Sequence, residues 1–137
     1  MNDPFRFISQ RIRRAIFAVA LGCITFVSLW PHEQLEMYVP EEVQAKDFLI
    51  HLTCYFVLEA CCLWAMARRA APMRSRVLSA LFCFLYGVLM ELLQTLPAIG
   101  RSASLSDARQ NGIGALLAAV LVPTFLWPPE RPRPPHP

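Results

Sequence analysis

The sequence predicts an all-α membrane protein, a bundle of four transmembrane helices with both termini on the cytoplasmic side. Its 137 residues are 55% hydrophobic and only 17% charged, with a mean hydropathy of +0.40, whereas soluble domains have about 25% charged residues. The apolar residues are collected into four runs, 15–30, 48–66, 77–96 and 112–127, and the arginines lie in blocks between them. This pattern favours a small polytopic membrane protein over a soluble or disordered chain.

The first apolar run, 15–30, follows a basic segment, residues 1–14, which we expect to lie at the membrane interface. The run is shorter than the roughly 20 residues that cross a bilayer, but the arginine side chains before it can extend it by snorkelling. It ends in Trp-Pro-His at 30–32, without a small-residue cleavage site. We therefore interpret it as an uncleaved transmembrane span.

The second and third runs, 48–66 and 77–96, have the length of spanning helices. The fourth run, 112–127, reaches that length if its helix begins near Asp107 with its polar start facing protein. Residues 15–127 thus form the predicted four-span domain. The remaining segment, 128–137, holds six of the twelve prolines, so we expect a disordered, extended tail.

The distribution of lysine and arginine predicts the orientation, because cytoplasmic loops of membrane proteins are enriched in both. The N-terminal segment, the loop after the second run and the tail hold ten of them, and the two other loops hold three. We therefore expect an inner-membrane protein with both termini inside, and no nucleic-acid partner. The residues on the basic side are Arg6, Arg11, Arg13, Arg14, Arg68, Arg69, Arg74, Arg76, Arg131 and Arg133, and those on the other side are Lys46, Arg101 and Arg109.

The cysteines give no sign of a disulfide framework or a zinc knuckle, since their number is odd and no CxxC spacing occurs. All of them fall inside apolar runs, and we interpret them as small hydrophobic residues of the core. They are Cys23, Cys54, Cys61, Cys62 and Cys83.

Ionisable side chains inside the predicted spans need a role, because inserting each of them into a bilayer costs about 3 kcal/mol. His51 and Glu59 lie in the second run and Glu91 in the third. The topology places His51 and Glu91 near the outer surface and Glu59 near the middle of the membrane. His51, Tyr55 and Glu59 are spaced by four residues, so they share one face of a helix.

Two further pairs of polar residues follow helical spacing near the same depth. Glu91 and Gln94 share a face, and Gly87, one turn inward, permits a close neighbouring helix. Asp107 and Asn111 form a similar pair at the start of the fourth span. Because charges and amides avoid lipid, we expect the polar groups of three spans to face one another in the outer half of the membrane.

The stretch YGVLMELLQTLPAIGRSASLSDARQNGIGA resembles the signature of VanZ-like membrane proteins. That signature has a membrane glutamate with a glutamine three residues on, an arginine-serine loop, and Asp-x-x-x-Asn-x-x-Gly opening the last span. The upstream stretch KDFLIHLTCY matches in part: its charged pair is reversed and further from the histidine, and Leu52 stands where the family has phenylalanine. The matching residues are Glu91, Gln94, Arg101, Asp107, Asn111 and Gly114, and upstream Lys46, Asp47, His51 and Tyr55.

This resemblance covers about residues 46–118 and implies a small helical membrane domain of the cell envelope, in a family named after glycopeptide (teicoplanin) resistance. With the expected cluster, it indicates an outward-facing pocket that binds or processes a membrane lipid or a lipid-linked, cell-wall-related precursor. Glu91 and His51 are the candidate acid and base, and Arg101 would hold an anionic head group. The other candidate binding residues are Gln94, Asp107, Asn111 and Tyr55.

Two alternatives stay open at this stage. The chain can be a non-catalytic membrane subunit or assembly factor, with a protein partner and a polar cluster that is purely structural. A metal site formed by His51, Glu91 and Asp107 has an acceptable set of donors, but these come from three separate segments and we do not assign one. The sequence specifies no cofactor, substrate or oligomeric state, and it does not decide whether the protein is an enzyme.

Overall fold

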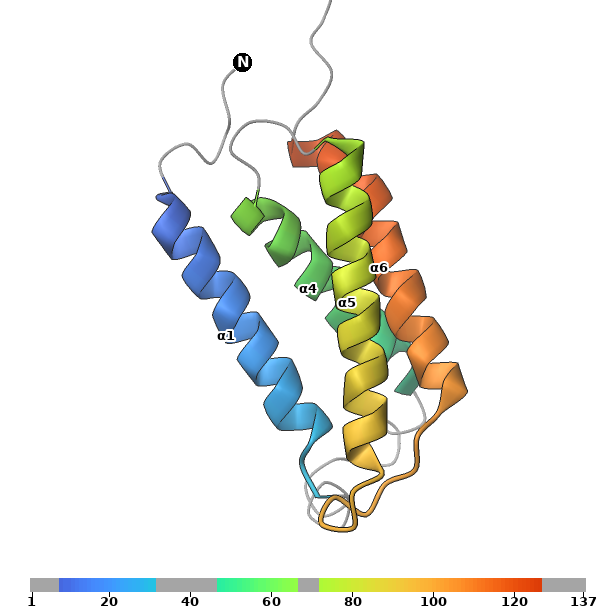
Figure 1. Cartoon of the computed structure of the whole chain (residues 1–137). Helices are drawn as coiled ribbons and strands as arrows, with labels where there is room; N and C mark the ends of the chain where they lie inside the picture. Colours follow the sequence, from blue (N-terminus) through green and yellow to red (C-terminus); the bar gives the residue numbers. More distant parts are fainter. Residues whose placement is uncertain (1–7, 32–46, 67–71, 127–137) are drawn as a thin grey trace, which may run out of the picture.

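The structure, a computed structural model, describes residues 8–31, 47–66 and 72–126, and these are all-helical (Figure 1). The four helices in this part of the chain are α1 (Gln10–Ser28), α4 (Asp47–Met66), α5 (Met73–Gln94) and α6 (Leu105–Leu126). The predicted all-α class is confirmed. The proline-rich tail, the arginines at 6, 68, 69, 131 and 133, Lys46 and the side chain of Asp47 lie outside the described residues.

The helix starts follow local capping more closely than they follow hydropathy. The Ser9 hydroxyl accepts a hydrogen bond from the Ile12 backbone N–H at 3.3 Å, and α1 therefore starts within the predicted basic segment. Similarly, the Ser104 hydroxyl accepts from the Asp107 N–H at 3.2 Å and starts α6. The loop between α5 and α6 turns at Gly100, whose φ of 68° is a left-handed conformation that glycine adopts without strain.

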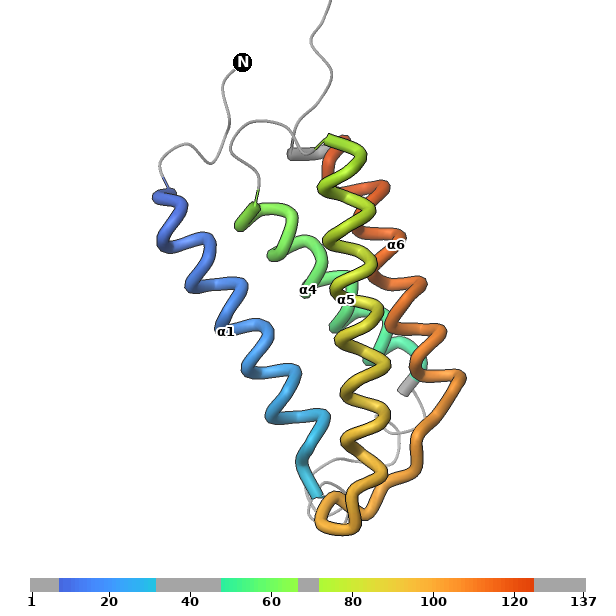
Figure 2. Tube along the Cα trace, viewed as in Figure 1, coloured from blue at the N-terminus to red at the C-terminus, as the bar shows by residue number. Residues whose placement is uncertain are grey.

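The chain trace in Figure 2 shows α4, α5 and α6 side by side with α1 beside them, and α4 contacts all three other helices. Its most extensive contact is with α6. Gly114 makes this contact possible, because a Cβ atom there would lie 2.3 Å from the backbone oxygen of Leu52 on α4. The two backbones thus touch with no side chain between them, as small residues permit in membrane helix pairs.

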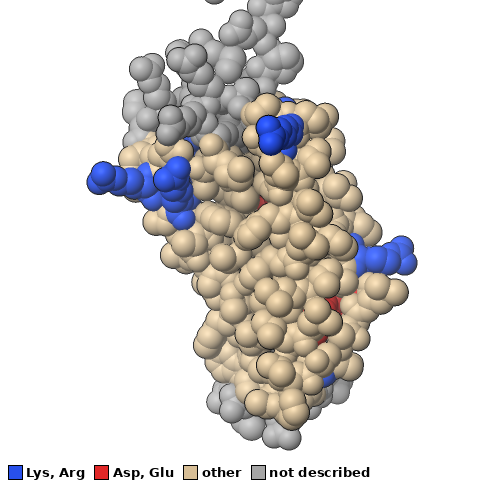
Figure 3. Space-filling model, in the orientation of Figure 1, with Lys and Arg blue, Asp and Glu red and all other residues tan. Residues whose placement is uncertain are grey.

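The core of the bundle is small and the outer surface of the helices is apolar. Its central cluster of buried apolar residues consists of Tyr55, Leu58, Cys62, Cys83 and Ala115. Two helices, Phe48–Met66 and Met73–Gln94, are long and apolar enough to cross a membrane. Figure 3 shows a surface mostly without charged side chains, with several arginines at the end where α1 and α5 begin and a few others on the flank and towards the opposite end. Large apolar side chains exposed on the outer faces include Val19, Phe26, Leu85, Leu92, Leu116 and Val120.

Candidate functional site

Three of the predicted site residues meet at the end of the bundle where α4 and α6 begin and α5 ends (Figure 1). His51 lies in the first turns of α4, Glu91 in the last turn of α5 and Asp107 in the first turn of α6. One potential ligand atom of each, a histidine nitrogen or a carboxylate oxygen, lies within 4.8 Å of the other two. The expectation that these ionisable groups face one another is confirmed.

Glu91 is the most enclosed carboxylate of this cluster, with 4% of its surface exposed. Its Oε2 atom accepts a hydrogen bond from the backbone N–H of Ser104 at 2.9 Å. The carboxylate therefore lies at the N-terminus of α6, where the unpaired N–H groups and the helix dipole favour negative charge. The guanidinium of Arg101 favours the ionised form of this carboxylate, and the neighbouring carboxylate of Asp107 disfavours it.

A hydrogen bond between His51 and Asn111 fixes the orientation of the imidazole ring. The His51 Nδ1 atom lies 3.0 Å from Oδ1 of Asn111, which is 1% exposed. Because an amide oxygen only accepts hydrogen bonds, Nδ1 carries a proton in this arrangement. The hydrogen bond to Asn111 thus sets which ring nitrogen carries a proton.

Tyr55 follows His51 by four residues, about one turn further along α4. Its side chain is 2% exposed, and its hydroxyl has no hydrogen-bond partner among the described residues. The ring packs against Gly87, where a Cβ atom would lie 3.0 Å from Tyr55 Cε1 and 3.0 Å from Asn111 Cβ. The predicted close approach of a helix at Gly87 is thus confirmed. The hydroxyl is buried beside the cluster without a partner, which is an unfavourable state for a polar group.

Gln94, predicted as a binding residue, has a different partner. Its side-chain amide donates a hydrogen bond at 2.9 Å to the backbone oxygen of Ser28, the last residue of α1. Helix ends have carbonyl groups without intrahelical partners, and Gln94, which is 2% exposed, satisfies one of them. Its described hydrogen bond therefore joins α5 to α1.

Two contacts of this region were missed by sequence reasoning. The Ser104 N–H and the Ser28 carbonyl are backbone groups, so no residue type marks them. The Ser-x-x-Asp spacing of residues 104–107 does mark a helix start, and it could have placed the N–H groups of α6 beside Glu91. Glu59, for which the sequence indicated no partner, accepts a hydrogen bond from the Ser79 hydroxyl at 2.6 Å.

The arrangement can support two kinds of chemistry. A histidine with one protonated nitrogen beside two carboxylates can transfer a proton to or from a bound molecule. The same three side chains are also an acceptable donor set for a divalent cation. Glu91 lies at the closed, inner side of the cluster, whereas His51, Arg101 and Asp107 are half-buried.

Fold and site together define an all-helical protein that has two helices apolar enough to cross a membrane and a histidine–carboxylate cluster at one end of its bundle. Comparisons of the chain with protein-family models, with curated proteins and with solved structures find no match. The VanZ-like resemblance therefore rests on the sequence motif.

Proposed function

We propose that the chain is a four-span, VanZ-like protein of the bacterial inner membrane whose polar cluster binds or processes a lipid-linked or cell-wall-related molecule. The observation that carries this proposal is the convergence of His51, Glu91 and Asp107 within 4.8 Å at one end of the bundle. Keeping three ionisable groups from three helices inside a membrane costs free energy. A functional role explains their convergence better than chance does.

The four-span topology is supported by the surface of the bundle. Large apolar side chains are exposed on α1 and α6 as well as on the two helices that pass the length and composition test. Arg11, Arg14, Arg74 and Arg76 lie at the end opposite the cluster, in the first turns of α1 and α5. With the basic end inside, the cluster faces outward. A reporter fused at position 130 should be active only in the cytoplasm, and activity on the outer side would overturn this topology.

In this proposal the half-buried Arg101 holds an anionic head group, since its planar guanidinium can donate two parallel hydrogen bonds to a phosphate. Its charge already acts on Glu91, so the two groups border one site. Glu91 and His51 are the acid and base for any proton transfer there. Asp107 and Asn111 orient the bound molecule and the imidazole ring.

The direct test is to identify the lipids that copurify with the protein by mass spectrometry. The wild type should carry an enriched head-group species that Glu91→Gln loses. Arg109→Gln is the control, because it removes an exposed charge of α6 near the same end of the bundle, outside both clusters, and should keep that species. Identical lipid profiles for the wild type and a folded Glu91→Gln variant would exclude Glu91 from the site.

The alternative, a structural cluster in a non-catalytic subunit, is favoured by one specific observation. The buried groups of the cluster are already paired, Glu91 with the Ser104 N–H and His51 with Asn111. In that case Arg101→Lys, which keeps the charge but loses the planar fork, should leave the cellular phenotype intact. Under the binding proposal, the Arg101→Lys protein accumulates to normal levels in the cell, but cells that carry it lose the phenotype.

A further inference from the structure

A second cluster of potential ligands lies in the interior of the bundle, away from the site described above. Glu59 and Cys62 on α4 and Cys83 on α5 place a carboxylate oxygen and two sulfur atoms within 4.8 Å of one another. We propose that these three residues bind a thiophilic metal ion, with Zn²⁺ as the best fit. This proposal is independent of the function proposed for the polar cluster.

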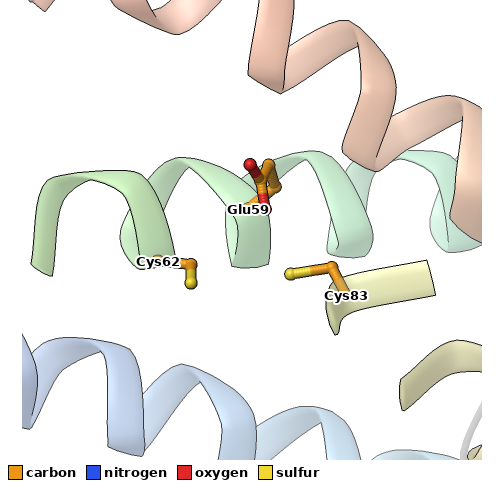
Figure 4. Close-up of side chains that lie close together, drawn as sticks. All are labelled: Glu59, Cys62 and Cys83. Atoms are coloured by element: carbon orange, nitrogen blue, oxygen red, sulfur yellow. The ribbon is translucent and has the colours of Figure 1, made fainter. Parts of the chain in front are cut away.

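The directions of the side chains suit a shared ion. Figure 4 shows the thiols of Cys62 and Cys83 pointing toward one another between α4 and α5, with the Glu59 carboxyl group next to them. All three are enclosed, with exposed fractions of 4% for Cys62 and 0% for the other two. Tetrahedral zinc with Zn–S bonds of about 2.3 Å separates its sulfur ligands by roughly 3.8 Å. The two sulfur atoms thus need to approach one another by no more than about 1 Å, and the carboxylate oxygen needs to approach each sulfur by only slightly more.

An independent observation at Glu59 points to a missing ligand. Its Oε1 atom accepts the hydrogen bond from Ser79, and its buried Oε2 atom has no partner within hydrogen-bond geometry in the part of the chain that the structure describes. The further hydrogen-bonding contact of this carboxyl group is with the Cys83 thiol, which is itself one of the proposed ligands. A fully buried carboxylate oxygen without a partner is costly. A metal ion bound between this oxygen and the two sulfur atoms removes that cost.

A cavity of about 440 Å³ borders the site at Cys62, and this side of the site has room for a fourth ligand. Cys62 and Ser79 line it, and so does Met66, whose sulfur lies 3.7 Å from the Cys62 sulfur. A zinc ion with two thiolates and one carboxylate carries a net negative charge. Arg14 lines the same cavity and can offset that charge.

The donor set selects the class of ion. Mg²⁺ and Ca²⁺ prefer oxygen ligands, so two sulfur donors exclude them. Zn²⁺ accepts mixed sulfur and oxygen ligands, and three protein ligands with an open fourth position are typical of a zinc site that meets solvent or substrate. Cu⁺ also prefers sulfur, and a disulfide between Cys62 and Cys83 is the remaining alternative use of the thiols. The test separates all three.

The full-length protein, purified in micelles with a phosphine reductant and freed of metal, is titrated with Co²⁺ as a spectroscopic probe. We expect one equivalent to give thiolate-to-cobalt charge-transfer absorption and intense tetrahedral bands, which one equivalent of Zn²⁺ abolishes. Cobalt bound by His51, Glu91 and Asp107 cannot give the charge-transfer band, because that cluster contains no sulfur. This measurement on the wild type needs no variant to fold.

Variants then locate the ligands. Cys83→Ser should abolish the charge-transfer band, and Glu59→Gln should weaken cobalt binding by about ten-fold or more. Cys23→Ser is the matched control, since Cys23 is exposed on α1 and should leave the band unchanged. No charge-transfer band in the wild type, a band that survives Cys83→Ser, binding of Cu⁺ alone, or a Cys62–Cys83 disulfide found by mass spectrometry without reductant would each overturn the proposal.

Discussion

Replacing Gly114 with alanine should separate α6 from α4 and destabilise the bundle. The new Cβ atom would lie 2.3 Å from the Leu52 oxygen and 3.1 Å from the Phe56 backbone nitrogen. These are backbone atoms, so no side-chain rotation relieves the contact, and the helices must move apart by at least about 0.7 Å to reach 3.0 Å. Overpacking of this kind costs about 1–3 kcal/mol. Asn111, one turn away on α6, should then lose its hydrogen bond to His51.

Gly22→Ala is the control, because no atom lies within 4 Å of a Cβ added at this exposed position of α1. Both substitutions gain up to about 1 kcal/mol of helix propensity, so this contribution cancels in the comparison. The free energy of unfolding, measured by titration with a denaturing detergent, should be about 1–3 kcal/mol lower for Gly114→Ala than for Gly22→Ala. Equal stability of the two variants would show that α4 and α6 do not touch at Gly114.

Three further substitutions test individual contacts with the same measurement. Ser104→Ala removes the side-chain cap of α6 and should lower the free energy of unfolding by about 1 kcal/mol. The loss should be no larger, because the backbone N–H of residue 104 still donates to Glu91. Gln94→Leu removes the hydrogen bond from α5 to the α1 carbonyl and should also cost about 1 kcal/mol, and an unchanged stability would mean that the bond does not form. Tyr55→Phe should raise stability by about 1 kcal/mol, since it removes a buried hydroxyl without a described partner. A loss of stability would instead reveal a partner for that hydroxyl.

The helical class was predictable from composition, and so were the bounds of α4 and α6 to within about two residues, but the starts of α1 and α5 were not. The apolar run that marks the third span begins at residue 77, but α5 begins at Met73, directly after Pro72. Arginine at positions 74 and 76 delays the start of the apolar run but not the start of the helix. Hydropathy reports the environment of a segment, whereas the helix is defined by its backbone hydrogen bonds. For α6, the apolar run begins only at residue 112, but the expected start near Asp107 lies within two residues of the actual start at Leu105, which Ser104 caps.

The convergence of His51, Glu91 and Asp107 was predictable because one physical rule applies to all three: ionisable groups within apolar segments avoid lipid. The partners of Glu91 and Gln94 were not predictable by that rule. Both are backbone groups, and which N–H or carbonyl group lies opposite a side chain depends on how α5 packs against its neighbours. Spacing rules for cysteines also failed to indicate Cys62 and Cys83 as a pair of candidate metal ligands. These rules find ligands that lie close together in one segment, whereas the two thiols come from two helices.

The two candidate sites lie along one face of α4 and should act separately. His51 and Glu59 are eight residues apart, which is about 12 Å along a helix that rises 1.5 Å per residue. Tyr55 lies between them on the same face, and its buried hydroxyl has no hydrogen-bond partner among the described residues. Perturbations more than about 7–10 Å apart without shared partners usually add within about 0.5 kcal/mol. The stability effects of Glu91→Gln and Cys83→Ser should therefore add in the double variant. A clear departure from additivity would mean that α4 shifts as a rigid body and couples the polar cluster to the thiol site.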